Sequence, residues 1–375
     1  LLNVFYRALY ILSFTLLMAE VTKQPVIDFY TYPPVGCDDW RYVYQTALVR
    51  VYEMQMLSRA TLLDIANAES FRQAVDLLAG SEYALPKGGR NFAEVEDTLQ
   101  LRRKAVRELF SDLMIDEEIV ELFRTRHDFA NLRLAVRRTL SETKKPLGTD
   151  YSTDGNVPPE LFGQIFAEES ELDRSVLPDY VQQAIEQAVL AYYKNKDIRQ
   201  VDYAIDRVQA EYNLNRAKQL GSIFLLGLFR IQIDLTNIRT MLRLKFTQPA
   251  SPAGFTESEQ RNVFLKGGFI ELGRFRQGLE LGYEALAPLF FVTPYHRIVE
   301  AGASYLASNK SFLKVEQGCE EHLTGFLKST IQIAAGPQPI IAFLLMKENE
   351  IRTVRLILTA KKNFLDTKLI LDRMS

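Results

Sequence analysis

His127 and Asp128 are adjacent, and this pair is the first place in the sequence where metal chemistry is conceivable. A histidine–aspartate pair belongs to the metal site of one class of phosphohydrolases, but that site also needs an upstream histidine, and none precedes position 127. Asp38 and Asp39 resemble the start of a magnesium-binding motif for prenyl diphosphates, yet Trp40 follows where a further acidic ligand is needed. We therefore expect neither pair to bind a metal.

The sequence also lacks the common short signatures of catalysis. It contains no Gly-Lys dipeptide, and hence no GxxxxGK phosphate loop, and no GxGxxG, GxSxG, CxxC or HExxH. Three histidines and two cysteines, Cys37 and Cys319, leave little material for acid–base catalysis or a metal site. We expect no catalytic, cofactor-binding or metal-binding residues and no enzymatic activity.

A short pattern of acidic, apolar and basic residues occurs three times. Each copy opens with an acidic residue, followed by apolar residues one, four and eight positions later and by arginine five positions later. Asparagine stands three positions after the acid in the first two copies, and threonine in the last. The polar residues of this repeat motif are Asp128, Asn131, Arg133, Asp234, Asn237, Arg239, Glu350, Thr353 and Arg355. A weaker echo upstream of each copy ends in an acid: Glu96, Asp206 and Glu316.

The spacing of the motif indicates how it would be used on an α-helix. At about 100° per residue, the apolar positions form a stripe about 60° wide, flanked at about 40° by the acid and by the arginine. This is typical of a helix packed along a narrow seam with a polar rim. Burial contributes roughly 1.5 to 3 kcal/mol per apolar side chain and an exposed rim pair roughly 0 to 1 kcal/mol, so we interpret the motif as structural. Basic residues also cluster after each copy, and we interpret them as stabilising the C-terminal end of the helix dipole. For these clusters, a basic rim facing acidic partner loops or lipid headgroups is the alternative.

Helical spacing of apolar residues runs through the sequence, whereas strand-like alternation is hard to find, so we expect an all-α fold. Residues 43–57, for example, are predicted to form one helix. Two segments rich in Gly, Pro and small polar residues, 145–159 and 248–254, are predicted linkers. Because they separate three blocks that each contain one motif copy, we predict three similar helical repeats, over 18–147, 148–248 and 249–375.

Residues 1–17 form an apolar N-terminal extension. The uncharged run 8–19 is shorter than the roughly 20 residues that span a bilayer, and the first methionine is Met18, so we interpret the extension as a start-site artefact. A segment that touches a membrane surface is the alternative. The whole chain is globular in composition, and its net charge of −2 gives no overall attraction to nucleic acid or anionic membrane.

Several segments together resemble a known family. Residues 42–58 and 347–361, with the Asp-x-x-Asn-(Leu/Ile)-Arg motifs at Asp128 and Asp234, resemble the C subunit of the prokaryotic V-type (A-type) ATP synthases, which is related to the d subunit of the V-ATPases. The resemblance runs from about Tyr42 to the C-terminus. Thr353, which replaces the usual asparagine, and the extension 1–17 depart from the family pattern.

The resemblance implies a fold and a role. It implies three helical bundles arranged as a funnel around a pseudo-threefold axis, on the cytoplasmic face of a membrane, in prokaryotes the plasma membrane. It also implies a non-catalytic central-stalk subunit without cofactors, whose partners are the proteolipid subunits of the membrane rotor ring and the subunits of the central shaft. Neither nucleic acid nor a small-molecule substrate is expected as a partner.

Two other classes of function stay open from the residues alone. One is a helical-repeat adaptor unrelated to ATPases, in which the three blocks would stack linearly. The other is an all-helical enzyme acting on a phosphorylated or lipid substrate, which the missing ligand patterns disfavour. Within the ATPase interpretation, proton and sodium transport, and ATP synthesis and hydrolysis, are all compatible with the sequence.

Overall fold

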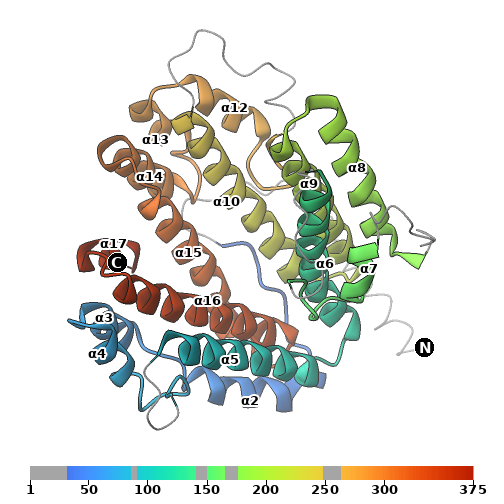
Figure 1. The fold of residues 1–375 in the computed structure, drawn as a ribbon. Coiled ribbons are helices and arrows are strands. Elements are labelled where there is room, and N and C mark those ends of the chain that lie inside the picture. Colours follow the sequence, from blue (N-terminus) through green and yellow to red (C-terminus); the bar gives the residue numbers. More distant parts are fainter. Residues whose placement is uncertain (1–31, 86–90, 141–149, 165–175, 248–262, 375) are drawn as a thin grey trace, which may run out of the picture. The chain divides into compact units, whose positions relative to one another are not determined.

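The computed structural model describes residues 32–85, 91–140, 150–164, 176–247 and 263–374, whose ribbon is shown in Figure 1. Within these ranges all regular structure is helical, which confirms the all-α prediction. The extension 1–17 and the predicted linker 248–254 lie outside the described residues. No described helix is long and apolar enough to cross a membrane.

Contacts divide the chain into two compact units, which we call the middle unit and the terminal unit. Among the described residues, the middle unit contains 118–282, and the terminal unit contains 32–117 and 283–374. The terminal unit therefore joins two parts of the chain that are far apart in sequence. The boundaries of the three sequence repeats are a different division and stay a prediction.

Long helices dominate the middle unit. Its helices are α6 (Glu117–Leu140), α7 (Pro159–Gln164), α8 (Asp179–Asn195), α9 (Ile198–Gln219), α10 (Ile223–Thr247) and α12 (Leu272–Glu280). Apolar side chains of α6, α7, α8 and α9 form one buried cluster, which includes Phe129, Leu132 and Val136 from the first motif copy. The predicted apolar stripe of that copy is thus buried, and α10 packs against α9 and α12.

The terminal unit is built around one long helix, α16 (Pro337–Lys362). The other elements are η1 (Trp40–Tyr42), α2 (Val43–Glu53), α3 (Arg59–Asn67), α4 (Phe71–Asp76), α5 (Phe92–Leu113), η3 (Tyr283–Ala285), α13 (Leu286–Leu289), α14 (His296–Asn309), α15 (Leu313–Lys328), η4 (Ser329–Gln332) and α17 (Thr367–Met374). Helices α2, α3, α4, α5 and α15 all contact α16. Figure 1 shows α16 lying alongside α5.

Local sequence signals explain where several helices begin and end. Helix α5 begins with a capping box, in which Asn91 accepts from the backbone of Glu94 and the Glu94 side chain accepts from the backbone of Asn91. Ser58 caps α3 by accepting from the Thr61 N–H. Helix α8 ends at Asn195, and the C-cap Lys196 then takes a left-handed conformation with a φ of 52°.

The predicted helix over 43–57 is four residues too long. Helix α2 ends at Glu53, and the N–H groups of Gln55 and Met56 then donate to carbonyls only three residues back. The Leu57 N–H donates to the Glu350 side chain instead of continuing the helix. The apolar spacing that suggested a longer helix was misleading because Met54 is 86% exposed.

Candidate functional site

The first motif acid, Asp128 on α6, is fully buried and binds backbone. Its carboxylate accepts from the N–H groups of Asn156 and Val157, at 3.2 and 3.0 Å, and from the Tyr180 hydroxyl at 2.7 Å. Burial raises the pKa of Asp128, and these hydrogen bonds counteract part of that rise. We call such an acid with two consecutive backbone N–H donors a carboxylate clamp.

Asp234 on α10 forms a second carboxylate clamp of the same kind. It is fully buried and accepts from the N–H groups of Phe269 and Ile270, at 2.9 and 3.2 Å. Arg230, one helical turn earlier, lies 5.4 Å from the centre of the Phe269 ring. Burial lowers the pKa of Arg230, while the charge of Asp234 favours its protonated form. This clamp therefore includes a nearby cation.

The motif asparagines bind the backbone a few residues before the segments that the aspartates hold. The Asn131 side chain donates to the Ser152 carbonyl and accepts from the Ser152 N–H, both at 2.8 Å. The Asn237 side chain does the same with Leu265, at 2.9 and 2.8 Å. Because asparagine offers both a donor and an acceptor, each of them satisfies both backbone groups of one residue.

Each clamped segment has a glycine in the same register. Gly155 and Gly268 stand three residues after the asparagine-bound residue and directly before the two clamping N–H groups. A Cβ atom at either position would overlap Oδ1 of the clamping aspartate. The backbone can therefore approach the carboxylate only without a side chain there. Sequence reasoning missed this signal, although both glycines keep the same spacing.

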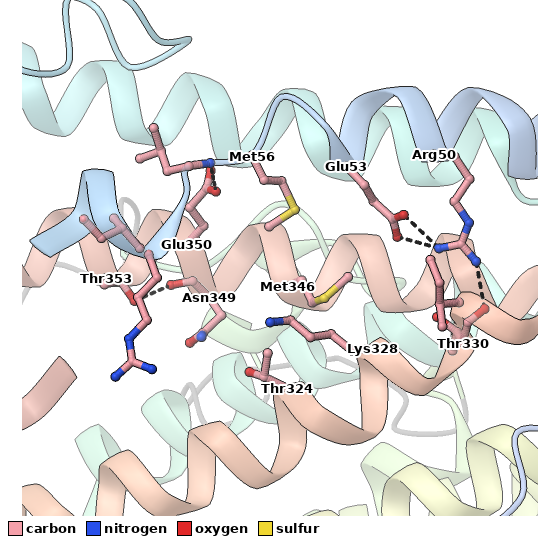
Figure 2. Close-up of a pocket in the computed structure, with 14 residues that line it drawn as sticks. Arg50, Glu53, Met56, Thr324, Lys328, Thr330, Met346, Asn349, Glu350 and Thr353 are labelled. Atoms are coloured by element: carbon pink, nitrogen blue, oxygen red, sulfur yellow. Dashed lines mark hydrogen bonds and ion pairs between the residues drawn. The ribbon is translucent and has the colours of Figure 1, made fainter. Parts of the chain in front are cut away.

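The third motif acid, Glu350 on α16, is buried in a different arrangement. It accepts from one backbone N–H, that of Leu57, at 2.6 Å, and from the Tyr83 hydroxyl at 2.6 Å. The Lys347 ammonium lies 2.5 Å from Glu350 and also pairs with Glu82. Burial and the charge of Glu350 raise the pKa of Tyr83. We call Glu82, Tyr83, Lys347 and Glu350 the Glu350 cluster; Figure 2 shows Glu350 and its bond to the backbone.

Thr353, which stands where the other copies have asparagine, does not hold a loop. Its hydroxyl donates to the Asn349 carbonyl of its own helix at 2.9 Å. Lys347 is only 3% exposed and has no counterpart in the other copies, where Thr125 and Ile231 occupy the same position. The third copy therefore replaces the asparagine contact with a buried ion pair.

Two motif arginines pair with an echo acid that belongs to a different copy of the motif. Arg133 pairs with Asp206 and lies 3.4 Å from Asp202. Arg355 pairs with Glu96 at 2.8 Å. Arg239, in the second copy, is half-buried on α10. The side chains of Arg133 and Arg355 are 32% and 52% exposed, so their ion pairs contribute little to stability.

The prediction of a polar rim on each motif helix was half wrong. The arginines lie at partly exposed edges, but Asp128 and Asp234 are 0% exposed and Glu350 is 5% exposed. The acids lie about 40° from the apolar stripe on a helical projection, but backbone segments fold over them and bury them. Backbone N–H groups compensate the buried carboxylates, which an exposed rim would not need.

The other sequence candidates, His127, Asp38 and Asp39, form local contacts in the described structure. The ring of His127 lies 3.2 Å from the Ser152 hydroxyl, beside the first clamp. Asp38 accepts from the Ala334 N–H at 2.8 Å, and Asp39 pairs with Arg41 at 2.7 Å. No group of three or more His, Cys, Asp or Glu residues suited to a metal ion occurs among the described residues. What the motif residues do is hold backbone segments on helices.

Comparisons with known proteins support the interpretation drawn from the sequence. The family model described as ATP synthase (C/AC39) subunit matches residues 45–373. The C subunit of the V-type sodium ATPase of Enterococcus hirae is 24% identical over 328 residues, which cover 87% of this chain and 96% of the relative. Both findings confirm the resemblance stated on the motif residues. The chain therefore belongs to the ATP synthase (C/AC39) subunit family.

Proposed function

We propose that this chain is the non-catalytic central-stalk subunit of a rotary V/A-type ATPase. It would couple the central shaft to the proteolipid rotor ring, on the cytoplasmic face of the membrane, for ATP-linked proton or sodium transport. Its partners would then be the shaft subunits and the ring. Family membership supports this role, since the Enterococcus hirae relative is named as the C subunit of a V-type sodium ATPase.

The observation that carries the proposal is the order in which the motif helices bind segments of the chain. Helix α6, in the first predicted repeat, holds residues 152–157 of the second. Helix α10, in the second, holds residues 265–270 of the third. Helix α16, in the third, holds Leu57 of the first. Each repeat thus binds the next, and the last binds the first.

This order favours a closed set of three repeats over a linear stack. In a linear solenoid each repeat contacts only its neighbours, so the last motif helix would not contact a segment of the first repeat. We propose that the repeats close around a pseudo-threefold axis, as the family resemblance implies. A body that transmits torque needs stiffness, and buried carboxylates with several hydrogen bonds each supply it.

Binding to both partners tests the proposed role. The full chain would be mixed with the purified rotor ring in detergent and with the purified shaft subunits, at low salt, and complexes would be separated by size. We expect the chain to bind both at once. Failure to bind either partner would reject the role and favour the adaptor alternative. A chain without residues 1–17 serves as a second sample, which should bind equally well if the extension is dispensable.

A further inference from the structure

A groove runs along one side of α16 in the terminal unit. One part has a volume of about 610 Å³ and the adjoining part about 480 Å³. The two parts share six lining residues and are therefore continuous: Arg59, Leu62, Thr324, Lys328, Asn349 and Thr353. We call it the α16 groove. Its walls come from the end of α2, from α3, from α15 with η4, and from α16.

One end of the α16 groove is apolar and adaptable. Met56, Leu57 and Met346 line it and are half-buried, and Ile331 at its edge is 72% exposed. Figure 2 shows the Met56 and Met346 side chains projecting into the same space, one from the segment after α2 and the other from α16. Methionine side chains adjust readily to the shape of a partner, so this end suits an apolar side chain from outside.

The free charge of the α16 groove is positive. Three of its acids pair with cations: Glu53 with Arg50, Glu320 with Arg373 and Glu350 with Lys347. Glu321 accepts from the neutral Gln317 amide and so keeps its negative charge, against the two positive charges of Arg59 and Lys328. The charged side chains of Arg59 and Lys328 form no hydrogen bond or ion pair within the described part of the chain. Figure 2 shows Lys328 extending from α15 along the groove towards Asn349.

We propose that the α16 groove binds an amphipathic helix of a partner protein that carries carboxylates beside its apolar face. Apolar side chains of that helix insert between Met56 and Met346, and its carboxylates pair with Arg59 and Lys328. Helices bind in grooves through apolar anchors at helical spacing, and complementary charges fix their orientation. The inference rests on the proposed function only for the partner's identity, which would be a neighbouring ATPase subunit.

The test uses the full chain labelled with ¹³C at the methionine methyl groups, with Met56 and Met346 assigned through Met→Leu variants. The probe is a synthetic amphipathic helical peptide with leucine on one face and glutamate on the other; a matched peptide has lysine for every glutamate. We expect the acidic peptide to shift the Met56 and Met346 signals and to leave those of the buried Met114 and Met241 unchanged. The double variant Arg59→Glu/Lys328→Glu should weaken binding about tenfold or more.

Lys104→Glu/Lys218→Glu, with the same change in net charge at two exposed lysines, is the matched control and should bind as the wild type does. Equal binding of both peptides, unchanged binding by the Arg59/Lys328 variant, or shifts caused only by anionic phospholipid vesicles would overturn the proposal. A wild-type chain that enters no ATPase complex would reject the proposed function. The peptide titration would still show whether the α16 groove binds an acidic amphipathic helix.

Discussion

Asp128 and Asp234 each hold two consecutive backbone N–H groups, whereas Glu350 holds one and takes its other contacts from Tyr83 and Lys347. The middle unit thus compensates its buried carboxylates with backbone dipoles that glycine allows to come close. The terminal unit compensates Glu350 with side chains. At the acidic position of the motif, Glu350 is therefore compensated by a lysine and a tyrosine, whereas Asp234 is compensated by a glycine-containing backbone segment.

The largest effect should come from the ion pair that sets the Glu350 cluster apart. Lys347→Met removes the ammonium and leaves Glu82 and Glu350 without their counter-charge, which should cost about 3 to 5 kcal/mol of unfolding free energy. Urea unfolding of the full chain measures it. Lys368→Met, at an exposed lysine, is the control and should change little. A loss below about 1 kcal/mol would show that the ammonium does not hold the cluster together.

Asp234→Asn tests the backbone clamp. The variant keeps the shape but turns an amide NH₂ towards one of the two N–H donors, so it should cost about 2 to 3 kcal/mol. Thermal and urea unfolding would measure the loss. Asp128→Asn should behave similarly, since both acids hold two N–H groups. Unequal losses would show that Tyr180 or Arg230, the features that differ between the clamps, contribute more than the backbone.

The position of Gly155 and Gly268 directly before the clamping N–H groups predicts that larger residues there lower the free energy of unfolding. Gly155→Ala and Gly268→Ala would each place a methyl group against the clamping carboxylate, at a cost of about 1 to 2 kcal/mol. Gly163→Ala is the matched control in the middle unit, because nothing lies within 4 Å of its Cβ position and alanine favours its helix. If the control and the clamp variants have the same melting temperature, the close approach of the glycine backbone to the aspartate is not required for stability.

The raised pKa of Asp128 predicts that the free energy of unfolding depends on pH, with a smaller effect than those above. The folded protein holds the Asp128 proton to a higher pH than the unfolded chain does, so stability falls as pH rises from the unfolded pKa through the folded one. Asp128→Asn removes this term. The stability of the wild type relative to that variant should therefore be greatest below about pH 4, near the unfolded pKa of an aspartate, and should decline above it. A relative stability that rises with pH would mean that the hydrogen bonds outweigh burial.

The smallest effect on stability is expected at the partly exposed ion pairs of the motif arginines. Arg355→Ala breaks the pair with Glu96 at a position where the arginine side chain is 52% exposed, and should cost under about 1 kcal/mol. A melting temperature within a few degrees of the wild type is the expected result. A loss as large as that of Asp234→Asn would contradict the view that stability resides in the buried acids.

Local spacing was enough to predict the all-α class and the apolar stripe of the motif, although the helix predicted over 43–57 ends at Glu53. The stripe Phe129, Leu132 and Val136 is buried, as helical periodicity predicts. The burial of Asp128 was not predictable in the same way, because it depends on a segment 28 residues later that folds over the helix and donates two N–H groups. A helical projection contains no information about such a segment.

The Glu350 cluster was harder still to predict. Tyr83 precedes Glu350 by 267 positions, so their contact cannot be inferred from local spacing. Lys347 and Glu350 are three positions apart on one helix, a spacing that predicts only a surface ion pair. The glycines were visible in the sequence, but their register mattered only once the asparagine-bound residues were known. Spacing within one helix is a local property, whereas these contacts are tertiary.

The central claim is that this chain couples ATP hydrolysis to ion transport. One measurement tests this coupling most directly. Membranes from cells that lack this chain would be assayed for ATP hydrolysis and for ATP-driven ion uptake into vesicles. The account predicts that hydrolysis by the catalytic subunits persists while ion uptake is lost, and that adding the purified chain back restores uptake. Uptake that continues unchanged without the chain would contradict the account.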